Sequence, residues 1–137
     1  MLSFLERKRG ISLIITLAIA IIIFYISSLT FEPASGAGGF GMKTVIYHII
    51  IFFTFTLFLL ISLLQGNLKK TEIIFGIIFA FIYALSDEFH QHFVPSRAMS
   101  LIDIFYDSFG IIFATTIYLS LIKYRSIKNS LNNFKNK

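Results

Sequence analysis

Long stretches of apolar residues constrain this chain more than any other feature. Residues 11–29 carry no charged side chain, and residues 44–64 carry only His48 as a group that titrates near neutral pH. A helix rises about 1.5 Å per residue and the hydrocarbon core of a bilayer is about 30 Å thick, so each stretch can cross a membrane. Two more apolar stretches follow at residues 73–92 and 101–122. The sequence therefore predicts an all-α, polytopic membrane protein with a bundle of four transmembrane helices.

Other architectures fit the pattern less well. A soluble helix bundle would show a polar stripe about every 3.6 residues, and the first two stretches have none. A β-barrel strand alternates apolar and polar residues, which these stretches do not. A cleaved signal peptide has an apolar core of about seven to fifteen residues, shorter than residues 11–29. We therefore expect the first helix to be retained, within one membrane domain that covers residues 1–137.

The basic residues predict the orientation of the helices. Lys and Arg collect in the cytoplasmic loops of membrane proteins. With the N-terminus inside, residues 7–9, residues 69–70 and a basic tail at 123–137 are cytoplasmic, and only Lys43 and Arg97 remain outside. We therefore expect both termini in the cytoplasm and a solvated tail. The net charge of +5 then reflects topology and contact with anionic lipids, and we expect no nucleic-acid partner.

Ionisable residues gather at one depth, close to the predicted outer surface. The third helix is purely apolar only at residues 73–85, so it must continue through residues 86–91 to cross the membrane. Asp103 and Asp107 open the fourth helix on one face, and Gly110 continues that face as close helix packing requires. An unpaired charge in the membrane costs several kcal/mol, so such groups pair or line a wet cavity. We therefore predict an outward-facing polar pocket.

The predicted pocket combines side chains of the last three helices with one from the outer turn. Its residues are Lys43, His48, Asp87, Glu88, His90, Gln91, Arg97, Asp103 and Asp107. If the pocket catalyses a reaction, Glu88 or Asp87 is the candidate general base, with His90 as its proton partner. The residue types also suit a metal ion, but His90 and His92 do not share a helix face and no H-E-x-x-H pair occurs. We therefore predict neither a metal nor another cofactor.

The polar run SDEFHQHFVPSR at residues 86–97 is followed by Asp103 and then by Gly110. This arrangement resembles the signature of the VanZ-like family of small bacterial membrane proteins, and YISS at residues 25–28 is also similar to the family. Where the family usually has Asn, this chain has Asp107, which adds a carboxyl group beside Asp103. The resemblance extends over nearly the whole chain.

The resemblance implies a multi-pass protein of the bacterial cytoplasmic membrane, with a link to reduced susceptibility to the glycopeptide antibiotic teicoplanin. We therefore predict that the pocket binds an anionic lipid or a lipid-linked cell-wall precursor, with Arg97 and Lys43 on the anionic headgroup. In one alternative the protein is a membrane-embedded hydrolase or transferase with Glu88 or Asp87 as its base. In another, the polar residues only pin the third helix to the fourth. The sequence leaves the oligomeric state open.

Overall fold

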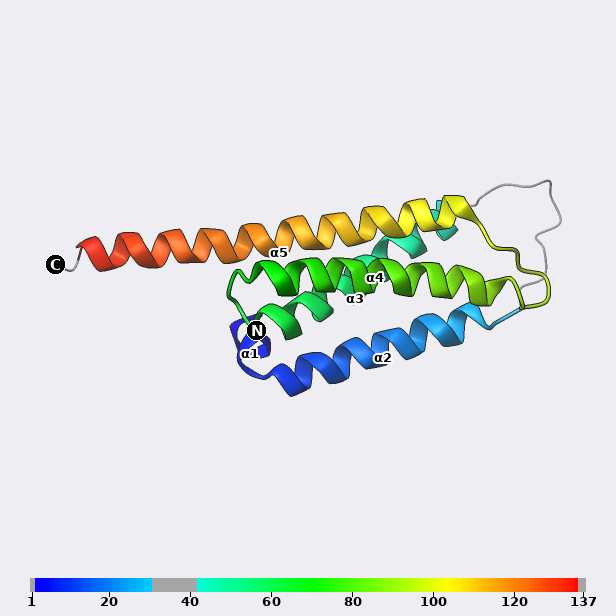
Figure 1. Cartoon of the computed structure of the whole chain (residues 1–137), viewed down its shortest axis with the longest axis horizontal. Helices are drawn as coiled ribbons and strands as arrows, with labels where there is room; N and C mark the ends of the chain where they lie inside the picture. Colours follow the sequence, from blue (N-terminus) through cyan, green and yellow to red (C-terminus); the bar gives the residue numbers. More distant parts are fainter. Residues whose placement is uncertain (1, 31–41, 136–137) are drawn as a thin grey trace.

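The computed structural model describes residues 2–30 and 42–135, and every regular element in these ranges is a helix. The elements are α1 (Leu2–Arg7), α2 (Arg9–Ser27), α3 (Met42–Leu64), α4 (Lys70–Gln91) and α5 (Leu101–Lys135). Helices α2 to α5 are each long and apolar enough to cross a membrane, which confirms the predicted four spans. They run side by side in Figure 1, and α5 continues beyond the others toward the C-terminus.

The bundle has two chemically different ends. At one end α2 and α4 finish while α3 and α5 begin, and this end holds the acidic residues of the polar run; we call it the acidic end (Figure 1). At the other end lie α1, the turn at residues 65–69 and the free part of α5, with most of the Lys and Arg residues. We call this the basic end.

The helix boundaries differ from the prediction at both ends of the chain. The first apolar helix begins at Arg9, and a separate short helix, α1, precedes it. The last helix does not end near residue 122 but continues to Lys135. No Gly or Pro interrupts residues 123–135, so nothing in the backbone stops the helix there. The side chains of this segment are mostly exposed, so the predicted solvated tail is a helix for most of its length.

Helix α3 lies at the centre of the packing. It contacts α2, α4 and α5, and its Phe52 and Phe55 are each 1% exposed. Toward the basic end, Leu60 of α3 packs with Tyr118 of α5 in a second apolar cluster. Large apolar side chains on the outer faces stay exposed, among them Ile14 at 68%. Exposed apolar surface of this extent is typical of helices that face lipid.

Gly110 sets the distance between α3 and α5. A Cβ atom at this position would lie 2.5 Å from the carbonyl oxygen of Ile49 and 2.8 Å from the amide nitrogen of Phe53. Only a residue without a side chain allows this approach of two backbones. The prediction that Gly110 serves close helix packing is therefore confirmed. The contact lies about one turn from Asp107, so it positions the acidic residues of α5 against α3.

Candidate functional site

The centre of the acidic end is the imidazole of His48. This side chain on α3 is buried, and its Nδ1 lies 2.8 Å from Oδ1 of Asp107 on α5. Its Nε2 lies 3.9 Å from Oδ2 of Asp103, one turn earlier on α5. Both ring nitrogens therefore face carboxyl groups, and the two aspartates share one face of α5 as their spacing predicts.

Helix α4 adds the carboxyl group of Glu88, which is 0% exposed. Its Oε2 accepts a hydrogen bond from the backbone N–H of Ser100 at 2.9 Å. One oxygen of Glu88, one ring nitrogen of His48 and one oxygen of Asp107 all lie within 4.8 Å of one another. Three helices thus bring an imidazole and two carboxyl groups into one small buried site.

Two carboxyl oxygens of this site are left without a hydrogen bond. Within the described ranges, Oδ1 of Asp103 and Oδ2 of Asp107 are buried and have no hydrogen-bond partner. Leaving a buried polar atom unsatisfied costs about 1–3 kcal/mol. The site therefore holds more acceptor capacity than its protein neighbours use.

Gln91 connects the buried acids to Arg97. Its Nε2 donates to Oδ2 of Asp87 at 2.9 Å and to Oε1 of Glu88 at 3.2 Å. Its Oε1 accepts a hydrogen bond from Nη1 of Arg97 at 3.0 Å. The amide nitrogen of Gln91 therefore donates to two carboxyl groups, while its amide oxygen accepts from a guanidinium. These bonds fix the side chains in the outer half of the site.

Arg97 also binds the end of α2. Its Nε donates to the carbonyl oxygen of Leu29 and its Nη2 to that of Ile26, both at 3.1 Å. These carbonyls lie where the last turn of a helix leaves acceptors unsatisfied. Part of the guanidinium therefore holds the segment after α4 against α2, in addition to the headgroup contact that the sequence predicts for it.

His90 and Lys43 lie at the edge of the site. His90 stacks on Phe24 with ring centroids 4.5 Å apart, and its Nε2 lies 3.0 Å from Oγ of Ser28. It therefore faces α2 and not the buried acids. Lys43, in the first turn of α3, is exposed and makes no ion pair with an acidic residue that the structure describes. The other predicted site residues lie together: His48, Asp87, Glu88, Gln91, Arg97, Asp103 and Asp107.

Ser100 was not among the predicted site residues, and it has two roles in the site. Its N–H binds Glu88, and its Oγ accepts a hydrogen bond from the N–H of Asp103 at 3.2 Å. The second contact is an N-cap of α5. A Ser three residues before an acidic residue at the start of an apolar stretch is a recognisable capping signal, so this residue was predictable.

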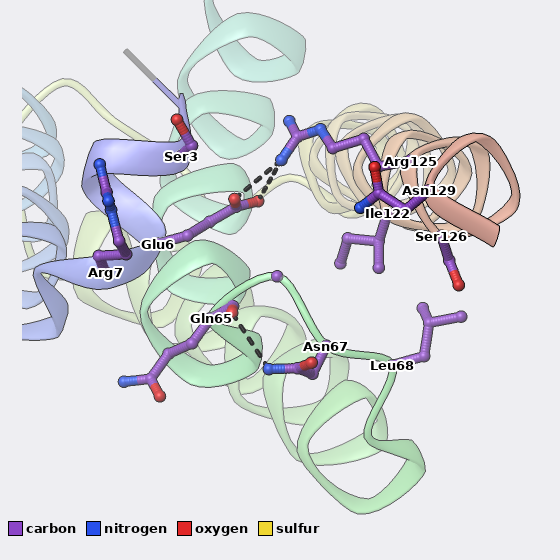
Figure 2. Close-up of a pocket in the computed structure, with 11 residues that line it drawn as sticks. Ser3, Glu6, Arg7, Gln65, Asn67, Leu68, Ile122, Arg125, Ser126 and Asn129 are labelled. Carbon is purple, nitrogen blue, oxygen red and sulfur yellow. Dashed lines mark hydrogen bonds and ion pairs between the residues drawn. The ribbon is translucent and has the colours of Figure 1, made fainter. Parts of the chain in front are cut away.

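A second polar site lies at the basic end and was not predicted. A cavity of about 610 Å³ opens there between α1, the turn after α3 and α5 (Figure 2). Glu6 is buried beside it, and its two carboxyl oxygens lie 3.0 and 2.8 Å from Nη1 of Arg125. The hydroxyl of Tyr118 donates to Oε1 of Glu6 at 3.1 Å. Gly66, with a φ of 77°, lies against the same carboxyl group. The bonds of Glu6 to Arg125 and Tyr118 therefore hold α1 against the bundle.

The comparisons with known proteins identify the family. A family model described as VanZ/LLP1 matches residues 3–123, a range that includes the whole acidic-end site. No curated protein and no solved structure matches the chain. The match covers most of the chain, and the four apolar helices support a multi-pass membrane protein related to VanZ. The chain belongs to the VanZ-like family.

Proposed function

We propose that this protein works in the bacterial cytoplasmic membrane, where its acidic end faces outward and binds an anionic lipid or a lipid-linked cell-wall precursor. The observation that carries the proposal is the group of buried ionisable residues that α3, α4 and α5 bring together. Ionisable groups inside membrane proteins are expensive to bury and usually mark a functional site. A contact that only holds two helices together would need fewer ionisable residues than this site contains.

The distribution of charge supports the orientation. The basic end carries residues 7–9, residues 69–70 and the basic residues of α5 beyond Ile122. The acidic end has Lys43 and Arg97 as its only Lys or Arg residues within the described ranges. Because cytoplasmic loops are richer in Lys and Arg, the basic end belongs in the cytoplasm. The acidic end then lies at the depth where outer-leaflet lipids present their phosphates.

The cations at the edge of the site favour an anionic ligand. Lys43 is exposed at the start of α3, and Arg97 is partly exposed beside Gln91. An ammonium and a guanidinium at the membrane surface are the groups that bind phosphate best. The ligand's headgroup would contact this edge, and its lipid chains would follow the apolar outer faces of the helices.

Two alternatives predict different use of the carboxyl groups. A hydrolase or transferase would use Glu88 or Asp87 as its general base, and such a base must reach the substrate. Both oxygens of Glu88 already accept hydrogen bonds from Gln91 and Ser100. A purely structural network would account for these bonds, but it would give no role to the cations Lys43 and Arg97 at the membrane surface. Binding at the edge of the site uses these cations and leaves the hydrogen bonds of Glu88 in place.

Teicoplanin susceptibility tests the proposal in cells, through the link that the family resemblance implies. A sensitive Gram-positive host would express the chain, Glu88→Gln or Glu72→Gln at matched membrane levels. Glu72 is a partly exposed acid at the basic end, far from Glu88 along α4, and serves as the control. We expect protection by the unaltered chain and by Glu72→Gln, and none by Glu88→Gln. Equal protection by all three would show that the function does not need the carboxyl group of Glu88. No protection by any of them would show that the link to teicoplanin does not apply to this chain.

A further inference from the structure

We propose that His48, Glu88 and Asp107 hold a divalent metal ion at the centre of the acidic end. Their nearest potential ligand atoms all lie within 4.8 Å of one another, and all three residues are buried. Ligand atoms around an ion with bonds of about 2.1 Å lie roughly 3–4 Å apart. Small side-chain rotations, with no movement of the helices, would close the group around an ion.

The unsatisfied carboxyl oxygens give independent support. Oδ1 of Asp107 faces His48, whereas Oδ2 is buried and has no hydrogen-bond partner within the described ranges. The side chain of Asp107 is 0% exposed, so bulk water does not reach this oxygen. Asp103, one turn away, also has a buried oxygen without a partner and can supply a further ligand. A cation would satisfy acceptors that the protein itself leaves open.

The negative charge of the site also favours a bound cation. Four carboxyl groups lie at this end, and Gln91 connects Arg97 to two of them, those of Asp87 and Glu88. The carboxyl groups of Asp103 and Asp107 face His48. In the absence of a cation, these carboxyl groups would repel a phosphate group that moved inward from Lys43 and Arg97 at the edge. A divalent ion would offset part of this negative charge, and it could bind an anionic headgroup directly. This role for the ion rests on the proposed function, whereas the metal site itself rests on the geometry alone.

The donor set indicates which ions to expect. Imidazole favours ions such as Zn²⁺, and carboxyl groups favour harder ions such as Mn²⁺. One imidazole with two or three carboxyl groups therefore suits Zn²⁺ or Mn²⁺. Three protein ligands would leave a position on the ion for water or a phosphate oxygen, as in catalytic zinc sites.

Metal titration of the purified protein tests the inference. The full chain would be purified without an affinity tag, and any bound metal would be removed with a chelator. The protein would then be titrated with Zn²⁺ and with Mn²⁺ by calorimetry, and bound metal would be counted by elemental analysis. We expect one ion per chain for at least one of the two metals. Glu88→Gln and His48→Gln should each weaken that binding at least tenfold, while Glu72→Gln should bind as the unaltered chain does.

The same experiment has clear failing outcomes. No stoichiometric binding of either ion, or unchanged binding by both Glu88→Gln and His48→Gln, would overturn the metal site. If a variant does not fold, the unaltered chain still decides, because a bound ion must raise its unfolding temperature relative to protein in chelator. Headgroup binding that persists unchanged in chelator would overturn the ion's role and leave the proposed function intact. Metal binding without any lipid binding would overturn the proposed function and the ion's role in it, and would leave the metal site itself intact.

Discussion

His48 and Asp107 are 59 residues apart in the sequence, yet Nδ1 of one lies 2.8 Å from Oδ1 of the other. The pair joins the second span of the bundle to the fourth. It forms because α5 approaches α3 at Gly110, where a side chain would collide with the backbone of the neighbouring helix. The chemistry of the acidic end therefore depends on a packing contact about one turn away.

Gly110→Ala should lower stability and disturb the site together. The added Cβ would meet backbone atoms of Ile49 and Phe53, which cannot move aside without shifting α3. Overpacking of this kind typically costs about 1–3 kcal/mol. The control is Gly76→Ala, whose Cβ would meet the flexible end of the Leu60 side chain. Unfolding of both variants in detergent, followed by circular dichroism, should rank Gly110→Ala as the less stable; the opposite order would contradict this account of the α3–α5 contact.

Gln91→Ala should break the connection between Arg97 and the buried acids. The variant loses the hydrogen bonds to Asp87, Glu88 and Arg97, two of which are made to buried carboxyl groups. Each such loss costs about 1–3 kcal/mol. Ser86→Ala is the control, because that exposed hydroxyl bonds only within its own helix. A Gln91→Ala protein as stable as the control would show that the network adds nothing to the fold.

Glu6→Gln should destabilise the basic end. Glu6 is buried and binds both Arg125 and Tyr118, so the amide would leave the guanidinium without its charged partner. We expect a loss of about 1–3 kcal/mol. Glu72→Gln should change stability by about 0–1 kcal/mol, because its 3.7 Å pair with Lys69 is exposed. Both variants remove one carboxylate at the basic end, so equal unfolding temperatures would refute the structural role of Glu6.

Single cysteines test the orientation, because the natural chain has none. Ala98 is exposed at the acidic end and Leu68 at the basic end. In intact cells a membrane-impermeant thiol reagent should label Ala98→Cys and should leave Leu68→Cys unlabelled until the cells are opened. Labelling of Leu68→Cys alone would place the acidic end in the cytoplasm and end the proposal of an outward-facing site.

The four spans and the depth of the ionisable residues could be predicted from the sequence for simple reasons. A span must contain enough consecutive apolar residues to cross the bilayer, so its position can be found from the sequence alone. Once the spans are known, the depth of each polar residue follows from its distance to the helix end. Asp103, Asp107 and Gly110 could also be placed on one face, because helical spacing is regular.

The predicted pocket included His48, Glu88 and Asp107, but the sequence could not predict that their potential ligand atoms lie within 4.8 Å of one another. The three residues lie on different helices, and the rotation of each helix about its axis depends on packing that no local pattern records. The residue types suited a metal ion, but we predicted none because no pair of histidines shares a helix face. The ion pair of Glu6 with Arg125 could not be predicted for the same reason, because its partners are 119 residues apart.

Binding of an anionic lipid by the purified protein tests the central claim most directly. The protein in phosphatidylcholine nanodiscs would be titrated with a polyprenyl diphosphate and with the neutral polyprenol. Lys43→Gln removes the exposed cation of the acidic end, and Lys70→Gln removes an exposed cation of the basic end as its control. We predict saturable binding of the diphosphate alone, weakened by Lys43→Gln and unchanged by Lys70→Gln. Equal binding of the neutral lipid, or equal effects of the two lysine variants, would contradict an anionic-lipid site at the acidic end.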